Sequence, residues 1–317
     1  MKNKIVKAYA PATIANLTAG FDMLGVALDK PGDFVTAKRI DEGVFRFTVE
    51  TTFADIPTTQ EKNIAAQVAL QMLDALKPAF GVEMILHKMM PVGSGMGSSG
   101  ASSVAAAVAV NALFDQPLSK QDLLPFVIEG ERKASGAAHA DNVAPGLFGG
   151  ACIIRNENPL DIIPFSVHEK ITWIVIHPHL TVATSEARRV LPSTIALKEV
   201  TRQMGNVSGL VLGLIQGDAA LIHRCLVDHI AEPLRESFIP GFSAVKAAAI
   251  AAGAVGCGIS GSGPAIFAVT LQSEKAQIIA NAMLAALSRT AQLPADVFIS
   301  HTNAVGAQII AEDAHAV

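Results

Sequence analysis

Residues 91–103, PVGSGMGSSGASS, most constrain how this chain can fold, because four glycines and five serines lead directly into an alanine- and valine-rich run. The preceding residues 82–88, VEMILHK, have the alternating pattern of a strand, and the run after the loop favours a helix to about residue 114. A glycine-rich turn between a strand and a helix presents free N–H groups and the positive end of the helix to an anion. The segment therefore predicts a phosphate-binding loop; a simple capped turn would need far fewer glycines.

Three phosphate-loop patterns can be compared with this segment. The Walker A loop is excluded because no lysine follows its last glycine. Residues 95–100, GMGSSG, match the dinucleotide fingerprint literally, but they do not open a βαβ unit and Asp115 follows a helix instead of a strand. The pattern strand, P-x-x-x-G-x-G-S-S, helix fits best. In it, Ser98 and Ser99 would cap the helix and offer hydroxyl groups to phosphate or Mg²⁺.

Composition narrows the class of protein. The 317 residues are 50% hydrophobic, which is enough for a large core and two domains, with a boundary expected near 155–170. Only 16% are charged, the net charge is −4 and no basic tract occurs, so we expect no nucleic-acid partner. Three widely spaced cysteines favour reduced thiols in a cytoplasmic protein over a disulfide framework or a zinc site.

Residues 247–273 carry no charge and are long enough to span a bilayer. Their middle reads GCGISGSGPA, a glycine-rich segment whose backbone N–H and C=O groups would lack hydrogen-bond partners in lipid. We therefore expect a helix, a buried strand, a glycine turn and a second buried strand, and no membrane partner.

The remaining pattern mixes strands and helices without a βαβ cadence, which favours an α+β fold. Strands are expected at 4–10, 33–40, 44–50, 82–88, 149–155, 171–178 and 296–302. Helices are expected at 62–76, 120–134, 196–216, 218–230, 241–252 and 274–289, with a loop rich in Gly, His and Asp before residue 149.

Three segments in order resemble the signatures of the GHMP kinases: PATIANLTAGFDMLG (11–25), the glycine loop, and GCGISGSGPAIFAV (256–269), a turn that would pack beside the loop. The resemblance implies a two-domain fold. Residues 1–160 would form an ATP-binding domain like the second domain of ribosomal protein S5, and residues 161–317 a ferredoxin-like domain. It also implies a homodimer.

Within these kinases, the first segment and ERKASGAAHADNVAPGLFGG (131–150), with its core HADNVAP, resemble the homoserine kinase family, as do TSEARRVLP (184–192) and DHIAEPLRESFIPGF (228–242). This implies ATP-dependent phosphorylation of the side-chain hydroxyl of L-homoserine. Thr18 stands where the family usually has glycine, which could shift the loop that holds Asn16 and Asp22, and Ala265 stands where a hydroxyl is common. Two alternatives stay open: a sister kinase for mevalonate or a sugar, and a nucleotide or amino-acid sensor without catalysis.

The resemblance places the triphosphate on the loop and Mg²⁺ on Ser98 and Glu131, with Glu129 as a competing ligand. Asn63 and Lys88 are further candidates for nucleotide contact. The expected nucleotide-binding loop residues are Pro91, Val92, Gly93, Ser94, Gly95, Met96, Gly97, Ser98, Ser99, Gly100 and Ala101.

An amino-acid substrate needs a carboxylate clamp, and arginine presents the matching planar fork. Arg188 and Arg235 are the candidates, while Asp22 with Asn16 beside it would hold the ammonium group. His139 and Asp141 alone are too few for a zinc site. By resemblance these two and Thr184 lie at the substrate.

Asn142 is expected to face the reacting hydroxyl, at a position where several relatives carry a catalytic aspartate. A neutral amide cannot act as a general base. Phosphoryl transfer depends mostly on alignment and charge stabilisation, so we expect a mechanism without a strong side-chain base.

Overall fold

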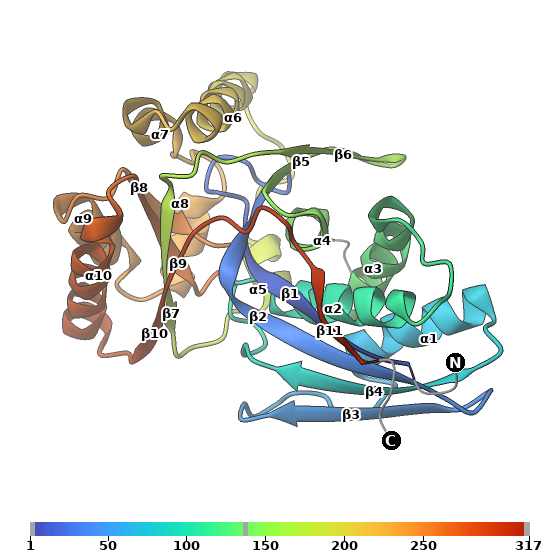
Figure 1. The fold of residues 1–317 in the computed structure, drawn as a ribbon. Helices are drawn as coiled ribbons and strands as arrows, with labels where there is room; N and C mark the ends of the chain where they lie inside the picture. The colour runs from blue at the N-terminus through green and yellow to red at the C-terminus, as the bar shows by residue number, and fades with distance from the viewer. Residues whose placement is uncertain (1–3, 136–138, 314–317) are drawn as a thin grey trace.

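The computed structural model describes residues 4–135 and 139–313 (Figure 1). Its first sheet has seven strands, with β11, β1, β2, β4 and β3 in spatial order and β5 and β6 continuing from β2. The strand bounds are β1 Ile5–Ala15, β2 Leu24–Ile40, β3 Phe45–Thr51, β4 Gly81–Lys88, β5 Ala151–Glu157, β6 Leu160–Phe165 and β11 Gln308–Asp313.

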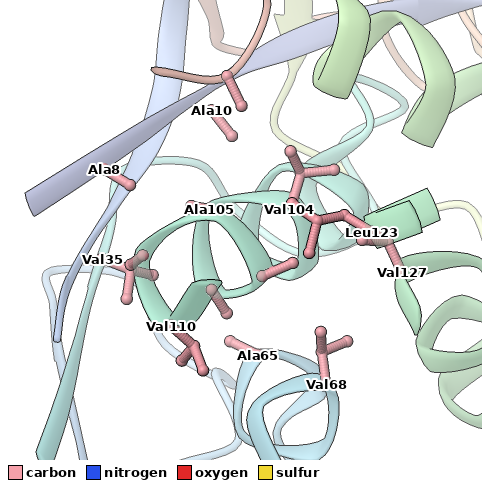
Figure 2. Packing of buried hydrophobic residues seen from close by; sticks show 14 of the residues in the cluster. Ala8, Ala10, Val35, Ala65, Val68, Val104, Ala105, Val110, Leu123 and Val127 are labelled. Carbon is pink, nitrogen blue, oxygen red and sulfur yellow. The ribbon is translucent and has the colours of Figure 1, made fainter. Parts of the chain in front are cut away.

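Four helices accompany this sheet: α1 Ile64–Leu76, α2 Ser98–Ala112, α3 Lys120–Ser135 and α4 Ala140–Phe148. Helix α2 lies on β1 and β2, and α1 and α3 pack against it (Figure 1). Figure 2 shows why α2 can be so deeply buried: alanines and valines from the strands and from α1 surround it, and small side chains allow close approach. The helix that follows the glycine loop is therefore fixed in the centre of a core.

The second sheet has the antiparallel order β10, β7, β9, β8, with β7 Thr172–Pro178, β8 Gly256–Ile259, β9 Ile266–Thr270 and β10 Ala295–Ser300. Helices α9 Phe242–Ala251 and α10 Ala276–Ala291 share one core cluster with it. The connection after β7 holds α5 Thr184–Arg189, α6 Leu197–Gln216, α7 Ala219–Cys225 and α8 Glu232–Arg235. This βαββαβ order confirms the expected ferredoxin-like domain.

Strand β7 is buried along its whole length because both of its faces are covered. Trp173 and Val175 point into a cluster that also contains Leu17 and Leu24 from the first half of the chain. Ile174 and Ile176 point to the opposite face, toward α9 and α10. The first of these clusters joins the two sheets into one packed body.

The chain between residues 242 and 270 follows the expected order of helix, strand, glycine turn and strand. Within the described ranges, no helix is long and apolar enough to cross a membrane.

Several expected elements were wrong or incomplete. The loop before residue 149 is helix α4, and the helix expected at 218–230 is reduced to α7, which ends at Cys225. The strand at 33–40 is the second half of the longer β2, and β6 and β11 were not predicted. The division after residue 160 stays a prediction, although β11 returns to the first sheet and pairs with β1.

Candidate functional site

A cleft of about 430 Å³ lies where the glycine loop meets the chain segments that follow β7 and β8. A cleft of this size suits a small-molecule site. It brings together most of the predicted site residues: Asn16, Asp22, Asn63, Lys88, Val92, Gly93, Ser94, Gly95, Gly97, Ser98, Ser99, Glu131, His139, Asp141, Asn142, Thr184, Arg188 and Arg235.

Pro91, Met96, Gly100 and Ala101 are not among the described residues that line the cleft. Met96 shows the reason, because its side chain is fully buried in the core that joins the two sheets. Its carbonyl accepts a 3.1 Å hydrogen bond from the N–H of Thr13. Met96 therefore holds the loop against the core, and Gly100 and Ala101 lie within α2.

The loop alternates glycines in the left-handed region with other residues: φ is 68° at Gly93, 78° at Gly95 and 64° at Gly97. Only glycine adopts this region without steric cost. At Gly97 a Cβ would also lie 2.0 Å from the hydroxyl of Thr13. The glycines therefore allow the loop to curl and to approach other segments of the same chain closely.

The glycine turn after β8 packs directly on the loop, as the resemblance implied. The Ser260 hydroxyl donates to the carbonyl of Gly95 at 2.6 Å, and the N–H of Ala265 donates to the carbonyl of Ser94 at 3.2 Å. A Cβ on Gly95 would come within 2.8 Å of both Gly263 and Ser260 carbonyl oxygens. The phosphate loop is thus held by the second sheet.

Helix α2 begins without a side-chain cap, so the expectation that Ser98 and Ser99 would cap it was wrong. Gly97 is the N-cap, and its φ of 64° turns the chain into the helix. Ser98 is then the first helical residue and its hydroxyl donates only a 3.4 Å bond to the Met90 carbonyl. The first N–H groups of the helix stay available to an anion.

Lys88 lies beneath the loop, 4% exposed, and forms a buried ion pair with Asp33. Its Nζ also donates to the Ser98 carbonyl at 2.7 Å and to the Ser102 hydroxyl at 3.0 Å. Burial lowers the pKa of Lys88, against the opposing effect of Asp33. The expected contact between Lys88 and nucleotide stays a prediction; in the structure Lys88 anchors the start of α2.

Glu131, on α3, is a buried carboxylate at the wall of the cleft. Burial raises its pKa to about 7, while the hydroxyl of Ser99, which donates to Oε2 at 3.2 Å, acts in the opposite direction. A carboxylate with two serine hydroxyls nearby is an oxygen donor set that suits Mg²⁺. Ser99 contacts Glu131 directly, whereas the sequence singled out Ser98.

The charged groups expected to hold an amino acid meet in the same cleft. Arg188, on α5, pairs with Asp22 through one guanidinium nitrogen, Nη2, which lies 3.0 Å from each carboxylate oxygen. Arg235 is 5% exposed and donates to the carbonyls of Ala187 and Gly261, each at 3.1 Å. Both guanidinium groups lie over the ring of Phe21. Two cations and one carboxylate therefore share a pocket edge.

Asn16 shapes the loop that carries Asp22. Its side-chain oxygen accepts from the N–H of Asp22 at 2.8 Å, and its side-chain nitrogen donates to the Gly261 carbonyl at 2.9 Å. Thr18 adopts the glycine-like φ of 62°, and its hydroxyl lies 1.9 Å from the point where Gly258 would carry a Cβ. Gly258 thus makes room for Thr18, and the Asn16–Asp22 contact is kept.

His139 and Asp141 begin helix α4 beside these charges. Burial raises the pKa of Asp141 to about 7, with Asp22 adding to the effect. Burial lowers the pKa of His139, and Arg188 adds to that effect. Three residues of the segment that carried the resemblance, 136–138, lie outside the described residues.

Asn142 also lies in the cleft, and its side-chain oxygen accepts a 2.8 Å hydrogen bond from the hydroxyl of Thr13. Sequence reasoning missed Thr13, although a polar residue within the apolar strand of the first signature was a signal for it. It also missed the lining residues Lys62 and Thr181, which are exposed and lie in segments without a distinctive pattern, and Ser262, which stands in the glycine turn of the third signature.

Comparisons with known proteins agree with this geometry. Residues 63–150 match the model of the GHMP kinases N terminal domain, and residues 210–289 match that of the GHMP kinases C terminal domain. The chain is 42% identical to the homoserine kinase of Chlorobaculum tepidum, covering 97% of this chain and 98% of the relative. It is 43% identical to that of Chlorobium phaeobacteroides, covering 97% and 100%.

A crystal structure of homoserine kinase from Cytophaga hutchinsonii superposes with a TM-score of 0.92 at 46% identity, covering 96% of this chain and 97% of that chain. The likeness extends over both sheets. The expected two-domain GHMP kinase fold is thereby confirmed.

Proposed function

Because the chain belongs to the homoserine kinase family of the GHMP kinases, we propose that its cleft transfers the γ-phosphoryl group of ATP to the side-chain hydroxyl of L-homoserine, giving ADP and O-phospho-L-homoserine. The product is an intermediate of threonine biosynthesis. One observation supports this most directly: a single cleft holds both a glycine phosphate loop and a cluster of two arginines with an aspartate.

The nucleotide end of the cleft is the loop with the start of α2. Positive φ angles at Gly93, Gly95 and Gly97 curl the loop, and the uncapped N–H groups of α2 offer fixed donors to phosphate oxygens. Glu131, with Ser98 and Ser99, would hold Mg²⁺. When bound, that ion would supply positive charge that offsets the charge of the triphosphate.

The amino-acid end binds and orients the alcohol. Arg188 and Arg235 would receive the substrate carboxylate, and Asp22 would receive the ammonium group. Asn142, fixed by Thr13, would align the hydroxyl. No strong side-chain base is required, because a loose transition state needs alignment and charge stabilisation above all.

The test is ADP release by the purified protein with Mg-ATP, comparing L-homoserine, L-serine, L-threonine, mevalonate and galactose. Phosphorus NMR would identify the phosphorylated product. We expect turnover with L-homoserine alone. Turnover with mevalonate or galactose would support kinase activity but contradict the assignment of the pocket to an amino acid. ATP binding without turnover on any alcohol would favour a sensor.

The same proposal includes a homodimer in the cytoplasm. Helix α6 exposes the apolar side chains of Leu197, Met204, Leu212 and Ile215, which supports a protein contact there. Light scattering during gel filtration measures the mass directly, and a monomer at micromolar concentration would remove this part of the proposal.

A further inference from the structure

Two histidines and an aspartate gather on the second sheet, and none of them lines the cleft. His177 is directly opposite Asp296 in the ladder between β7 and β10. His179 follows two residues after His177, just beyond the end of β7. His177 lies on the same face of β7 as Trp173 and Val175, because side chains alternate along a strand. The cluster lies at the start of the edge strand β10 and the end of β7. These two strands run side by side in Figure 1.

The spacing of the possible ligand atoms fits a small cation. Asp296 Oδ2 is 3.0 Å from His179 Nε2 and 3.6 Å from His177 Nδ1, and all three ligand atoms lie within 4.8 Å of one another. Ligand atoms about 2.0–2.2 Å from a zinc ion are roughly 3.4 Å apart in a tetrahedron. The two distances from Asp296 bracket that value.

One atom of the cluster needs a partner. His177 is only 6% exposed, and its Nδ1 makes no hydrogen bond to any described residue. Buried polar nitrogens in proteins nearly always have a partner. The side chains of His179 and Asp296 are about half exposed, at 47% and 48%, so solvent and an ion can reach the cluster.

We propose that His177, His179 and Asp296 form a binding site for a divalent transition-metal ion, with zinc as the best fit. Two imidazoles and one carboxylate are the ligand types that zinc takes, and three protein ligands leave a fourth position for water. Such an ion would tie β7 to the edge strand β10. The site is separate from the Mg²⁺ position proposed beside Glu131.

A plain histidine–carboxylate pair is the alternative, and the first sheet contains one. His87 Nδ1 is 2.8 Å from Glu50 Oε2, and its Nε2 is 3.0 Å from the Thr36 hydroxyl. Both ring nitrogens of His87 therefore have partners, and no third ligand joins them among the described residues. This pair provides a matched control for the cluster.

The experiment is a calorimetric titration of the untagged, chelator-treated protein with Zn²⁺, repeated with His179→Gln and Asp296→Asn. We expect one zinc per chain in the parent and a loss of affinity of at least about tenfold in each variant. His87→Gln and Glu50→Gln should bind zinc as the parent does. At the same zinc concentration, zinc should also raise the melting temperature of the parent by more than that of Asp296→Asn.

A Co²⁺-loaded sample adds a spectroscopic reading. Visible absorption of tetrahedral Co²⁺ should develop in the parent and in His87→Gln, and be lost in His179→Gln. Equal zinc affinity in all five proteins would place the ion elsewhere and overturn the proposal, as would a parent that binds no zinc. Far-ultraviolet circular dichroism without metal confirms that each variant is folded, so that lost affinity reports the site.

Discussion

Arg235 and Glu131 are buried residues at the cleft, and burial has a different consequence for each charged group. Two of the guanidinium nitrogens of Arg235 donate to main-chain carbonyls, which fixes the plane of the group, and arginine carries further donors for a carboxylate. Glu131 keeps a pKa near 7 because burial opposes its charge. Each residue therefore has a role that can be measured separately.

We expect Arg235→Ala to raise the KM for homoserine by about 10–100-fold, the effect of losing a charge-assisted hydrogen bond, and to change the KM for ATP by less than about twofold. Steady-state kinetics with each substrate varied in turn measures both values. Arg189→Ala is the control, because Arg189 is a neighbouring exposed arginine that does not line the cleft. Equal losses for both substrates in Arg235→Ala would contradict the role of a carboxylate clamp.

Glu131 should make turnover depend on pH. Below about pH 7 its carboxyl is protonated and is a poor Mg²⁺ ligand, so the Mg²⁺ needed for half-maximal rate should increase as the pH falls through 7. Because the folded pKa is raised, the group favours the folded state at low pH, and this contribution is lost as the pH rises through 7.

Glu131→Gln, which stays neutral, should therefore abolish Mg²⁺-dependent turnover and yet stabilise the metal-free protein at pH 8 by about 2–3 kcal/mol. Urea unfolding at pH 5 and pH 8 measures the difference. Glu129, which is partly exposed, pairs with Arg132 and does not line the cleft, provides the control Glu129→Gln. A stability gain of the same size at both pH values would exclude the titration of Glu131 as the cause.

At the scale of elements, the glycine loop depends on contacts as well as on φ. Gly95 and Gly43 have similar φ angles of 78° and 73°, but a Cβ would meet carbonyl oxygens at Gly95 and nothing within 4 Å at Gly43. The two positions therefore separate backbone strain from steric conflict.

Gly95→Ala should raise the KM for ATP by at least about tenfold, because small displacements at a phosphate site have large effects. Gly95→Ala should also reduce the free energy of unfolding by more than Gly43→Ala does. For Gly43→Ala we expect a reduction of about 1–2 kcal/mol. Denaturant unfolding and kinetics measure both. If the two variants behave alike, the contact with the second sheet does not hold the loop.

Elements with a strong local pattern could be predicted from the sequence, and those set by distant chain could not. The strand, glycine loop and helix from residue 81 to 112 follow from local periodicity. β11 forms a strand because it pairs with β1, which lies about 300 residues earlier in the chain. Helix α4 was missed because its segment is rich in Gly, His and Asp, which suggests a loop. The helix is accommodated by a distant residue: Gly25 leaves room for the Asp141 carbonyl, where a Cβ would lie 1.7 Å away.

The candidate site shows the same division. Residue types and motifs indicated side chains that gather in one cleft, since Arg188, Arg235, Asp22 and Glu131 all line it; their roles stay predictions. Their partners depend on tertiary contacts: Asp22 with Arg188 is a pair 166 residues apart in sequence. Sequence patterns do not encode such distances.

At the scale of the whole molecule, the core around Trp173 contains residues from both halves of the chain. Trp173 is fully buried there against Phe267, and its indole N–H donates to the Thr302 hydroxyl at 2.9 Å. Unfolding either sheet would therefore expose this core.

We expect one cooperative unfolding transition. Trp173 is the single tryptophan, so its fluorescence reports the shared core, and far-ultraviolet circular dichroism reports both sheets and the helices. The two urea curves should have the same midpoint and slope. Midpoints that differ would show that the two sheets unfold independently.

The contact between the Ser260–Gly263 turn and the phosphate loop has a thermodynamic consequence. Gly95 accepts a hydrogen bond from Ser260, while the next residue of the turn, Gly261, accepts from Arg235 and Asn16 at the amino-acid end. A ligand that tightens one end restricts the same short turn that the other end uses. Binding at the two ends is then linked, and linkage is reciprocal. If bound nucleotide changes the affinity for the amino acid by some factor, bound amino acid changes the affinity for nucleotide by the same factor.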